Sequence, residues 1–294
     1  MDQDPSLAGH LAGHLGGLLR ADVQAVARIG GQHGVSHYRV VLADGRMVFA
    51  KVAAEAGFGG EAGFAAEASG LRWLGEVGAV PVPEVLGWDD RALAIAWIPQ
   101  ERADGRSAES FGRDLAALHA AGSGSFGAPW PGALAGLPLD NARAGAWPEW
   151  YASRRLLPYA RRARDAGTLD AADVALVETV AARAGALAGP AELPSRIHGD
   201  CWSGNVLWSG GRGALIDPAA HGGHRETDLA MLALFGAPFL GRILGAYQEA
   251  SPLAAGWQGR VPLHQLHPLL VHACLFGAAY RDAVLDAARS ALAC

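Results

Sequence analysis

The sequence predicts an α+β fold of two lobes, a small β-rich lobe followed by a larger, mainly helical one. Short apolar runs of strand length dominate residues 1–100, whereas residues 101–294 show mostly amphipathic helical spacing. The 294 residues are 51% hydrophobic and 18% charged, which is typical of a globular chain with a sizeable core. We therefore expect domains of 1–100 and 101–294. Because no long linker joins them, they should share one cleft.

The first lobe is expected to begin with a helix over 6–20. Three strand-like runs follow, at 23–29, 37–42 and 47–52. Asp44-Gly45, between the last two runs, is the usual signal of a tight hairpin turn.

A second helix and two further extended segments complete this lobe. Residues 61–77 return to helical spacing, and Pro81 ends that helix. An extended segment through Val85 and a buried strand over 92–98 follow, so the order is β-β-β-α-β-β. Residues 98–100 would form the hinge between the lobes.

The second lobe is predicted as helices around a short β segment. Helices are expected at 107–121, 148–166, 171–187, 226–235, 238–249 and 264–293, and a Gly- and Pro-rich surface loop at 123–139. Three short strand-like runs lie at 195–197, 206–208 and 214–216. Each interior Gly costs a helix about 1 kcal/mol, so the 40 glycines make helix ends harder to predict than the helices themselves.

Charge and cysteine content restrict the classes of partner and compartment. A net charge of −5 and a pI near 6.1 argue against nucleic acid, because phosphate backbones require clustered Lys and Arg. Three cysteines without a C-x-x-C pair are typical of reduced cytosolic thiols. No secretory signal is recognisable, and no run approaches the roughly 18 apolar residues of a membrane span. We expect a soluble cytoplasmic protein without a membrane partner; the sequence does not indicate its oligomeric state.

The most informative segment is H-G-D-C-W-S-G-N-V-L-W at 198–208, followed by G-A-L-I-D at 213–217. It places Asp200, Asn205 and Asp217 around two strand-like runs. Phosphoryl transfer from a nucleotide uses such a set: one carboxylate accepts the proton of the attacking hydroxyl, while an amide oxygen and a second carboxylate hold Mg²⁺. Asp and Asn are also common turn formers, so the flanking strands and the upstream matches carry the argument.

The order of elements and this motif together predict a protein-kinase-like fold. The D-x-x-x-x-N spacing from Asp200 to Asn205 matches the catalytic loop of protein kinases, and Asp217 falls where their metal-binding Asp lies. Gly199 stands where protein kinases usually carry Arg. That difference favours a kinase of small molecules over a kinase of proteins.

Three glycines between the first two strands are candidates for contact with ATP. Gly30, Gly31 and Gly34 would let backbone N–H groups approach phosphate oxygens. A glycine cluster at this place also fits an ordinary hairpin loop. Trp97 and Ile98, which adjoin the hinge, complete the predicted ATP site on this side.

Lys51 ends an apolar run in which a solvated Lys would be a poor neighbour for Phe49. A Lys that reaches inward to the nucleotide phosphates explains this position, and Glu67 on the next helix would hold its ammonium. The alternative for Glu67 is a plain exposed helix residue.

With these residues in place, the chain resembles the fructosamine kinase (ketosamine 3-kinase) family, within the aminoglycoside and choline phosphotransferase-like superfamily. The resemblance covers almost the whole length, and its most specific segments are 198–208 and I-D-P-A-A-H-G-G-H-R-E-T-D-L-A-M-L-A-L-F-G at 216–236. Segments 64–74, 82–87 and 150–158 are also similar. The resemblance implies ATP-dependent phosphorylation of a sugar hydroxyl, usually the 3-hydroxyl, of a ketosamine such as ribulosamine or fructosamine. The product releases its amine, so the activity would repair glycated amines or protein lysines.

The resemblance also implies a role for each matching residue. Asp200 would be the base, Asn205 and Asp217 the Mg²⁺ ligands, Lys51 with Glu67 the phosphate clamp, His198 and Asp228 supports of the catalytic loop, and Trp202, His221, His224, Arg225 and Glu226 the substrate side. Trp202 could stack on the sugar or simply wall the cleft, and 221–226 also fits an ordinary loop. Cys201 replaces the usual Leu and reads as an apolar filler or, alternatively, a reactive thiol. Gln32-His33 replaces a cysteine of some members, so no redox switch is expected there.

Two other functions compete with a ketosamine kinase. A phosphotransferase for another hydroxylated amine, such as an aminoglycoside, would need clustered acids, and after residue 236 the chain offers only Glu249, Asp282 and Asp286. A nucleotide-binding pseudokinase that serves as a scaffold would have no reason to keep the complete set of catalytic residues.

Overall fold

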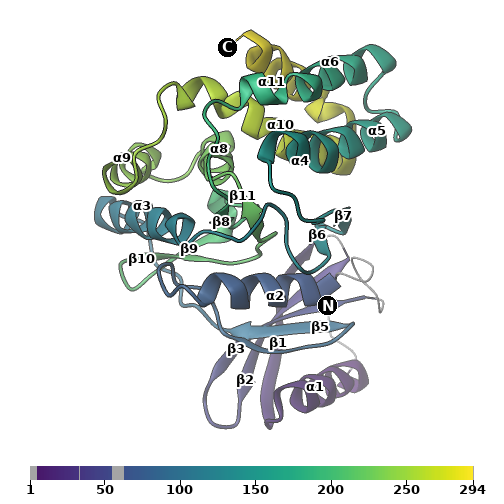
Figure 1. Ribbon diagram of the computed structural model, residues 1–294. Coiled ribbons are helices and arrows are strands. Elements are labelled where there is room, and N and C mark those ends of the chain that lie inside the picture. Colours follow the sequence, from purple (N-terminus) through teal and green to yellow (C-terminus); the bar gives the residue numbers. More distant parts are fainter. Residues whose placement is uncertain (1–4, 33, 55–62, 294) are drawn as a thin grey trace.

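The computed structural model describes residues 5–32, 34–54 and 63–293 and shows a small β-rich lobe below a larger helical lobe (Figure 1). The elements of the first lobe are α1 (Pro5–Leu19), β1 (Val23–Gln32), β2 (Val35–Leu42), β3 (Met47–Ala53), α2 (Gly63–Gly75), β4 (Val85–Trp88) and β5 (Ala92–Ala96). The strands form one antiparallel sheet in the order β1-β2-β3-β5-β4. The predicted β-β-β-α-β-β order is confirmed; residues 61 and 62 of the predicted helix lie outside the described part.

The first hairpin is longer than predicted. β1 and β2 continue to Gln32 and Val35, and Gly30 and Gly31 pair with His37 and Ser36 inside the ladder rather than forming a loop. A Cβ on Gly31 would lie 2.6 Å from the carbonyl oxygen of Val35, so the close approach of the two strands requires glycine there. Between these strands Gly34 has a φ of +79°, and His33 lies outside the described residues.

The second lobe is mainly helical, as predicted. Its helices are α3 (Gly105–Ala120), α4 (Trp147–Tyr151), η1 (Ala152–Leu156), α5 (Leu157–Asp165), α6 (Ala171–Ala182), α7 (Ala184–Leu187), η2 (Ser203–Asn205), α8 (Glu226–Leu234), α9 (Leu240–Ala250), α10 (Trp257–Phe276), η3 (Gly277–Tyr280) and α11 (Arg281–Ala293). Its strands form three two-stranded ladders, β6 (Gly132–Leu134) with β7 (Leu137–Leu139), β8 (Ser195–Ile197) with β11 (His221–Gly223), and β9 (Val206–Ser209) with β10 (Arg212–Leu215).

Four predictions for this lobe need correction. The helix expected over 171–187 is divided at Arg183 into α6 and α7. The helix expected over 148–166 contains one turn of π-helix, η1. The helix expected over 264–293 begins earlier, at Trp257, and is interrupted at Gly277, whose φ of +71° a helix cannot continue. The loop expected over 123–139 contains the hairpin β6–β7, whose turn uses Gly136 at a φ of +82°.

The two lobes are packed against each other. One apolar cluster joins Leu74 and Val80, at and just after the end of α2, to Phe111 of α3, Val206 of β9 and Leu229 of α8. The α2 helix accordingly lies between the sheet and the short ladders of the second lobe (Figure 1). A second, larger cluster fills the far end of the helical lobe, where α4, α5, α6, α10 and α11 meet. Burial of these apolar faces orders the elements around the cleft.

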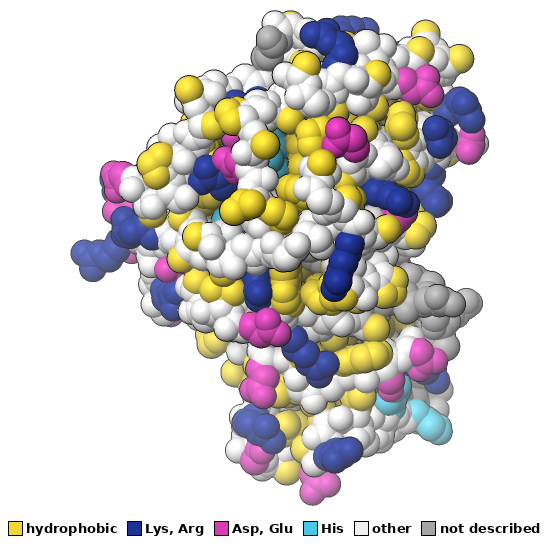
Figure 2. Space-filling model, viewed as in Figure 1, with side chains coloured by type: hydrophobic (Ala, Val, Ile, Leu, Met, Phe, Trp, Pro, Cys, Tyr) yellow, Lys and Arg dark blue, Asp and Glu magenta, His cyan; other side chains and the backbone are white. Residues whose placement is uncertain are grey.

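The surface shows no patch of one charge on the face drawn in Figure 2, where acidic and basic side chains alternate. One helical stretch, Trp257–Ala293, is long and apolar enough to cross a membrane by length and composition alone, with a mean hydropathy of 1.2. It is interrupted by η3, and both of its helices contribute side chains to the larger core cluster. That packing buries 39% of its most apolar 18-residue stretch.

Candidate active site

Asp200 and Asn205 lie on the loop between β8 and β9 and contact each other directly. The Asn205 amide nitrogen donates to Asp200 Oδ2 and to the Asp200 carbonyl oxygen, both at 2.9 Å. The 3₁₀ turn η2 between them brings the two side chains to the same point. Burial raises the pKa of the Asp200 carboxyl to about 7, with a further contribution from the charge of Asp217, while the Asn205 hydrogen bond opposes the shift. A carboxylate made more basic in this way suits proton transfer.

Lys51 joins the two lobes through ion pairs. Its Nζ lies 2.9 Å from both carboxylate oxygens of Glu67 on α2 and 2.6 Å from Oδ1 of Asp217. Burial disfavours its charge, but Asp217 and Glu67 outweigh this and raise the Lys51 pKa. Burial raises the pKa of Glu67 to about 7 against the effect of Lys51. For Asp217, burial is outweighed by Lys51, and the pKa is lowered. Lys51 is therefore charged and bridges carboxylates of the two lobes.

Asp217 follows β10 in a left-handed backbone conformation, with a φ of +53°. Among non-glycine residues, Asp and Asn tolerate this conformation best, although it still carries strain. Strained conformations are concentrated at functional sites because the surrounding structure holds a side chain in one direction. Here the conformation turns the carboxylate toward Lys51.

Asp228 of α8 holds the backbone of the loop that carries Asp200. Its carboxylate accepts hydrogen bonds from the backbone N–H of His198 at 2.7 Å and of Gly199 at 2.9 Å, and it contacts His119 Nε2 at 3.1 Å. His198 Nε2 contacts the Ile216 carbonyl oxygen at 2.8 Å, which ties this loop to the strand before Asp217. These contacts are those expected of loop supports. Gly199 has a φ of +81°, and a Cβ there would meet the Ala219 carbonyl at 2.3 Å.

A cavity of about 420 Å³ brings the central predicted residues together. Lys51 and Glu67 line it from the first lobe, and Asp200, Asn205 and Asp217 line it from the second. Trp202 also lines it, together with the turn of the β6–β7 hairpin. Its size is in the range of small-molecule sites.

The predicted glycine and hinge residues are not part of this cavity. Gly30, Gly31 and Gly34 are exposed and do not line it, although the neighbouring Gln32 does. Trp97 and Ile98 follow β5 and are half-buried; the Trp97 N–H donates to the Met47 carbonyl at 3.3 Å. Their contact with ATP stays a prediction.

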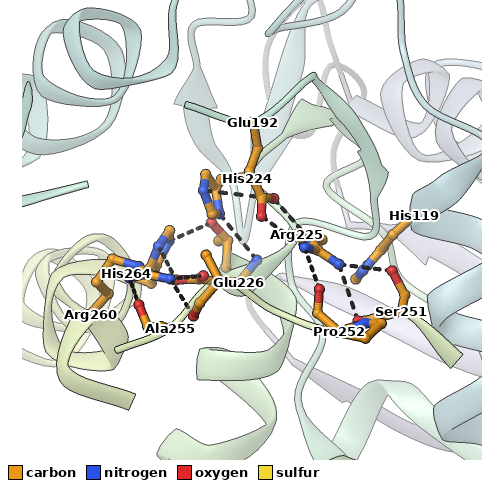
Figure 3. A network of polar contacts seen from close by, with 12 residues as sticks. His119, Glu192, His224, Arg225, Glu226, Ser251, Pro252, Ala255, Arg260 and His264 are labelled. Carbon is orange, nitrogen blue, oxygen red and sulfur yellow. Dashed lines mark hydrogen bonds and ion pairs between the residues drawn. The ribbon is translucent and has the colours of Figure 1, made fainter. Parts of the chain in front are cut away.

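Four residues predicted for the substrate side do not line the cavity, and that prediction is corrected. His221 is buried in the β8–β11 ladder, where its Nδ1 contacts the Ala219 carbonyl at 2.7 Å. Figure 3 shows His224, Arg225 and Glu226 within one polar network. Arg225 donates to both oxygens of Glu192 at 2.8 Å.

The other half of this network is a buried pair between Glu226 and Arg260 of α10. Arg260 donates to the two Glu226 oxygens at 2.9 and 2.5 Å. His224, Glu226 and His264 hold their ligand atoms within 4.8 Å of one another, as a metal site requires. Because the guanidinium occupies both carboxylate oxygens and places a positive charge there, we assign the cluster a structural role, joining α8 to α10. The sequence offered no signal for it, since the partners are distant in the chain.

Sequence reasoning also missed an aromatic side of the cavity. Phe235 at the end of α8, His272 and Phe276 of α10 and Tyr280 of η3 all line it. The spacing of four between the last three residues was a usable signal, because it places them on one helical face. In a segment this apolar, the same spacing reads as ordinary core.

Comparisons with known proteins identify the family. The family model for fructosamine kinase matches residues 14–293. A Thermus thermophilus relative, "Probable ketoamine kinase TTHA1179", is 34% identical over 224 residues, which cover 75% of this chain and 79% of the relative. The Escherichia coli K12 relative "Probable ketoamine kinase YniA" is 35% identical, covering 73% of this chain and 76% of the relative.

Solved structures are similar to the chain at two levels, one in sequence and fold and one in fold alone. A Thermobifida fusca protein assigned as a fructosamine-3-kinase superposes with a TM-score of 0.93 at 53% identity, covering 97% of this chain and 99% of that one. A gentamicin complex of the phosphotransferase APH(2")-IIa superposes at 0.63 with 12% identity, covering 99% and 97%, and shows the shared fold alone. The chain therefore belongs to the fructosamine kinase family and has the two-lobed, α+β, protein-kinase-like fold.

Proposed function

We propose that the protein is an ATP-dependent kinase that phosphorylates a sugar hydroxyl, the 3-hydroxyl, of a ketosamine such as ribulosamine or fructosamine. The main support for this proposal is that one cavity, in a chain of this family, is lined by all five predicted catalytic and metal-binding residues: Lys51, Glu67, Asp200, Asn205 and Asp217. Phosphorylation next to the ketoamine would lead to loss of the amine, so the cellular role would be the repair of glycated amines or protein lysines.

The donor set fits Mg²⁺. Carboxylate and amide oxygens are its usual protein ligands, and Asp217 and Asn205 would supply them. Bound Mg²⁺ neutralises charge on the phosphates. The Lys51 ammonium, 2.6 Å from Asp217, already balances this carboxylate with a positive charge. Once Asp217 is balanced by Mg²⁺ instead, Lys51 would pair with the phosphates. Glu67 would keep the Lys51 ammonium in place.

Asp200 would accept the proton of the sugar hydroxyl. Its carboxylate lines the cavity beside Trp202, and its raised pKa of about 7 makes it a better base than an ordinary carboxylate. Asn205 fixes its direction through the hydrogen bond at 2.9 Å. Positioning of the hydroxyl against this base and exclusion of water by the cavity walls would supply most of the remaining acceleration.

The second candidate, an aminoglycoside kinase, is less well supported. Among the described residues, the carboxylates that line the cavity are Glu67, Asp200 and Asp217, all used by the catalytic set. An acceptor with several ammonium groups would find no further acid in that lining. The complete catalytic set likewise argues against a pseudokinase. Cytoplasmic location and the absence of nucleic-acid and membrane partners remain part of the proposal.

The test is ADP release by purified protein with ATP and Mg²⁺. Acceptors are the ribulosamine and fructosamine of lysine, compared with kanamycin and choline. We expect turnover with a ketosamine to exceed the other two by at least about 100-fold, since a site shaped to one acceptor loses the positioning bonds with another. Phosphorus NMR of the product then locates the phosphate. Preference for kanamycin, with ketosamines inert, would leave only the kinase fold.

A further inference from the structure

We propose that the aromatic side of the cavity binds the amine-derived part of the acceptor, and that this part is apolar or aromatic. This inference deepens the proposed function and rests on it. The aromatic wall consists of Trp202, Phe235, His272, Phe276 and Tyr280, all of which line the cavity.

The five rings form a continuous array that starts beside the predicted base. Trp202, two residues after Asp200, meets Phe235 edge to face with ring centroids 5.9 Å apart. Phe235 meets His272 at 5.0 Å, and His272 meets Phe276 at 5.4 Å and Tyr280 at 4.9 Å. A group attached to a sugar held at Asp200 would therefore extend along these rings.

The wall is exposed although it is apolar. Trp202 and Phe235 each keep 37% of their surface accessible, and Phe276 keeps 50%. Single exposed apolar residues are ordinary, but a contiguous set in a cavity beside catalytic groups marks a ligand surface. An aromatic or aliphatic amine would cover these rings and bury their surface with its own.

The charges of the cavity support the same occupant. The wall itself carries no carboxylate, and the acids among the described lining residues, Glu67, Asp200 and Asp217, belong to the catalytic set. Burial and the nearby charge of Lys51 lower the pKa of His37, another lining residue. A small polar arm would leave water for a wall that is mostly hydrocarbon and offers few hydrogen bonds in return. A quaternary cation, which aromatic rings also attract, is the competing occupant. With no carboxylate in the wall to pair with such a cation, the proposal commits to an apolar or aromatic arm.

The ligand set for the test keeps one sugar and changes only the amine. Fructosamines of benzylamine, ethanolamine and a quaternary aminoethyl-trimethylammonium arm are titrated calorimetrically into the full chain without ATP. We expect the benzylamine adduct to bind about five- to tenfold more tightly than the ethanolamine adduct, as aromatic contacts of this kind allow. The same order should appear in KM during turnover. Equal affinity of the benzylamine and ethanolamine adducts, or tighter binding of the quaternary arm than of benzylamine, overturns the proposal.

Two variants locate the effect. Phe276→Ala should remove the preference for benzylamine, and so should Phe235→Ala, which guards against an effect on folding of either variant. Phe239→Ala is the matched control, because Phe239 is 48% exposed but does not line the cavity. It should leave the preference unchanged; loss of the preference in this control and not in the wall variants overturns the assignment.

The readout separates this inference from the proposed function. If no ketosamine is phosphorylated but the benzylamine adduct still binds preferentially through Phe276, the wall is supported and the kinase proposal fails. If ketosamines are phosphorylated with no difference among amines in affinity or KM, the kinase proposal stands and the wall is overturned.

Discussion

Lys51 sits between two carboxylates that belong to different lobes, and this position defines the chemistry of the cleft. The ammonium lies 2.9 Å from Glu67 and 2.6 Å from Asp217. Asp200 adds a third carboxyl group, and burial together with this crowding of carboxyl groups raises the pKa of Glu67 and of Asp200 to about 7. Such a site attracts a divalent cation and, through it, the phosphates of a nucleotide.

The first prediction concerns the base. Asp200→Asn should lower kcat by roughly 10²- to 10⁴-fold, since an amide cannot accept the hydroxyl proton, and should change ATP affinity little. The measurement is ADP release with a ketosamine, alongside an ATP titration. Asp165→Asn, an exposed position on α5, serves as the control and should keep wild-type turnover. Turnover of Asp200→Asn within threefold of wild type would remove Asp200 from this role.

The second prediction ranks the two metal ligands. Asp217→Asn should weaken Mg²⁺-dependent ATP binding more than Asn205→Ala does, because a charged ligand neutralises metal and phosphate where a neutral amide cannot. Asn is the appropriate replacement for Asp217, since it tolerates the φ of +53° better than Ala. The check is a Mg²⁺ titration of both variants at fixed ATP. Equal losses would show that the stronger ligand is misassigned.

The sequence allows prediction of site residues that lie close together in the chain at a characteristic spacing. Asp200 and Asp217 follow short strands and Asn205 immediately precedes one, so their meeting was foreseeable from the order of elements. His221, His224, Arg225 and Glu226 follow Asp217 closely in the chain, but they do not line the cavity. Glu192 and Arg260, the partners of Arg225 and Glu226, come from distant segments. Only the tertiary packing places these side chains outside the cavity lining.

At the scale of elements, α8 links the catalytic loop to the helical core. Its first turn carries Asp228, which accepts two backbone N–H bonds from that loop, and Glu226, which pairs with Arg260 of α10. The π-turn η1, the break at Gly277 and the β6–β7 hairpin were not predicted, because periodicity identifies helices without fixing local irregularities. Of these irregular elements, the β6–β7 hairpin and η3 line the cavity, whereas η1 does not.

The third prediction tests the connection between α8 and α10. Glu226→Gln should lower the free energy of unfolding by about 3 kcal/mol, because it leaves the buried Arg260 guanidinium without its counter-charge. Urea unfolding of wild type and variant measures this difference in the free energy of unfolding. Glu109→Gln breaks an exposed pair with Arg242 and should cost less than about 1 kcal/mol. Similar costs for the two variants would show that the buried pair contributes no more than a surface pair.

The stability effect of Glu226→Gln should depend on pH in a defined direction. Against burial, hydrogen bonds from His264 and Arg260 lower the Glu226 pKa from its ordinary 4.5 to about 2. A depressed carboxyl pKa contributes stability above the unfolded value, and that contribution is lost as the pH falls toward the folded value. The stability difference between wild type and Glu226→Gln should therefore be constant above about pH 5 and shrink between 4.5 and 2. A difference that grows on acidification contradicts this ionisation state.

At the scale of the whole molecule, the two lobes are joined by more than a hinge. The Leu215 N–H donates to the Pro81 carbonyl at 2.9 Å, and the Arg196 guanidinium lies 4.3 Å from the ring centroid of Trp73 on α2. The apolar cluster from Leu74 to Leu229 runs across the same junction. The change from sheet to helices near residue 100, where we predict the domain boundary, therefore lies between lobes that are packed against each other.

The last prediction follows from this arrangement. Because Mg²⁺–ATP would bind Lys51 from one lobe and Asp217 from the other, it should stabilise both lobes together, in a single unfolding transition. A ligand at about 100 times its Kd adds roughly 2.7 kcal/mol, which for a chain of this size raises Tm by about 5 °C. Calorimetric scans with ATP and Mg²⁺ are compared with scans in excess chelator and with Lys51→Met, where the shift should vanish. Two transitions, of which only one moves with ATP, would mean that the lobes unfold separately and that the nucleotide is held by one of them.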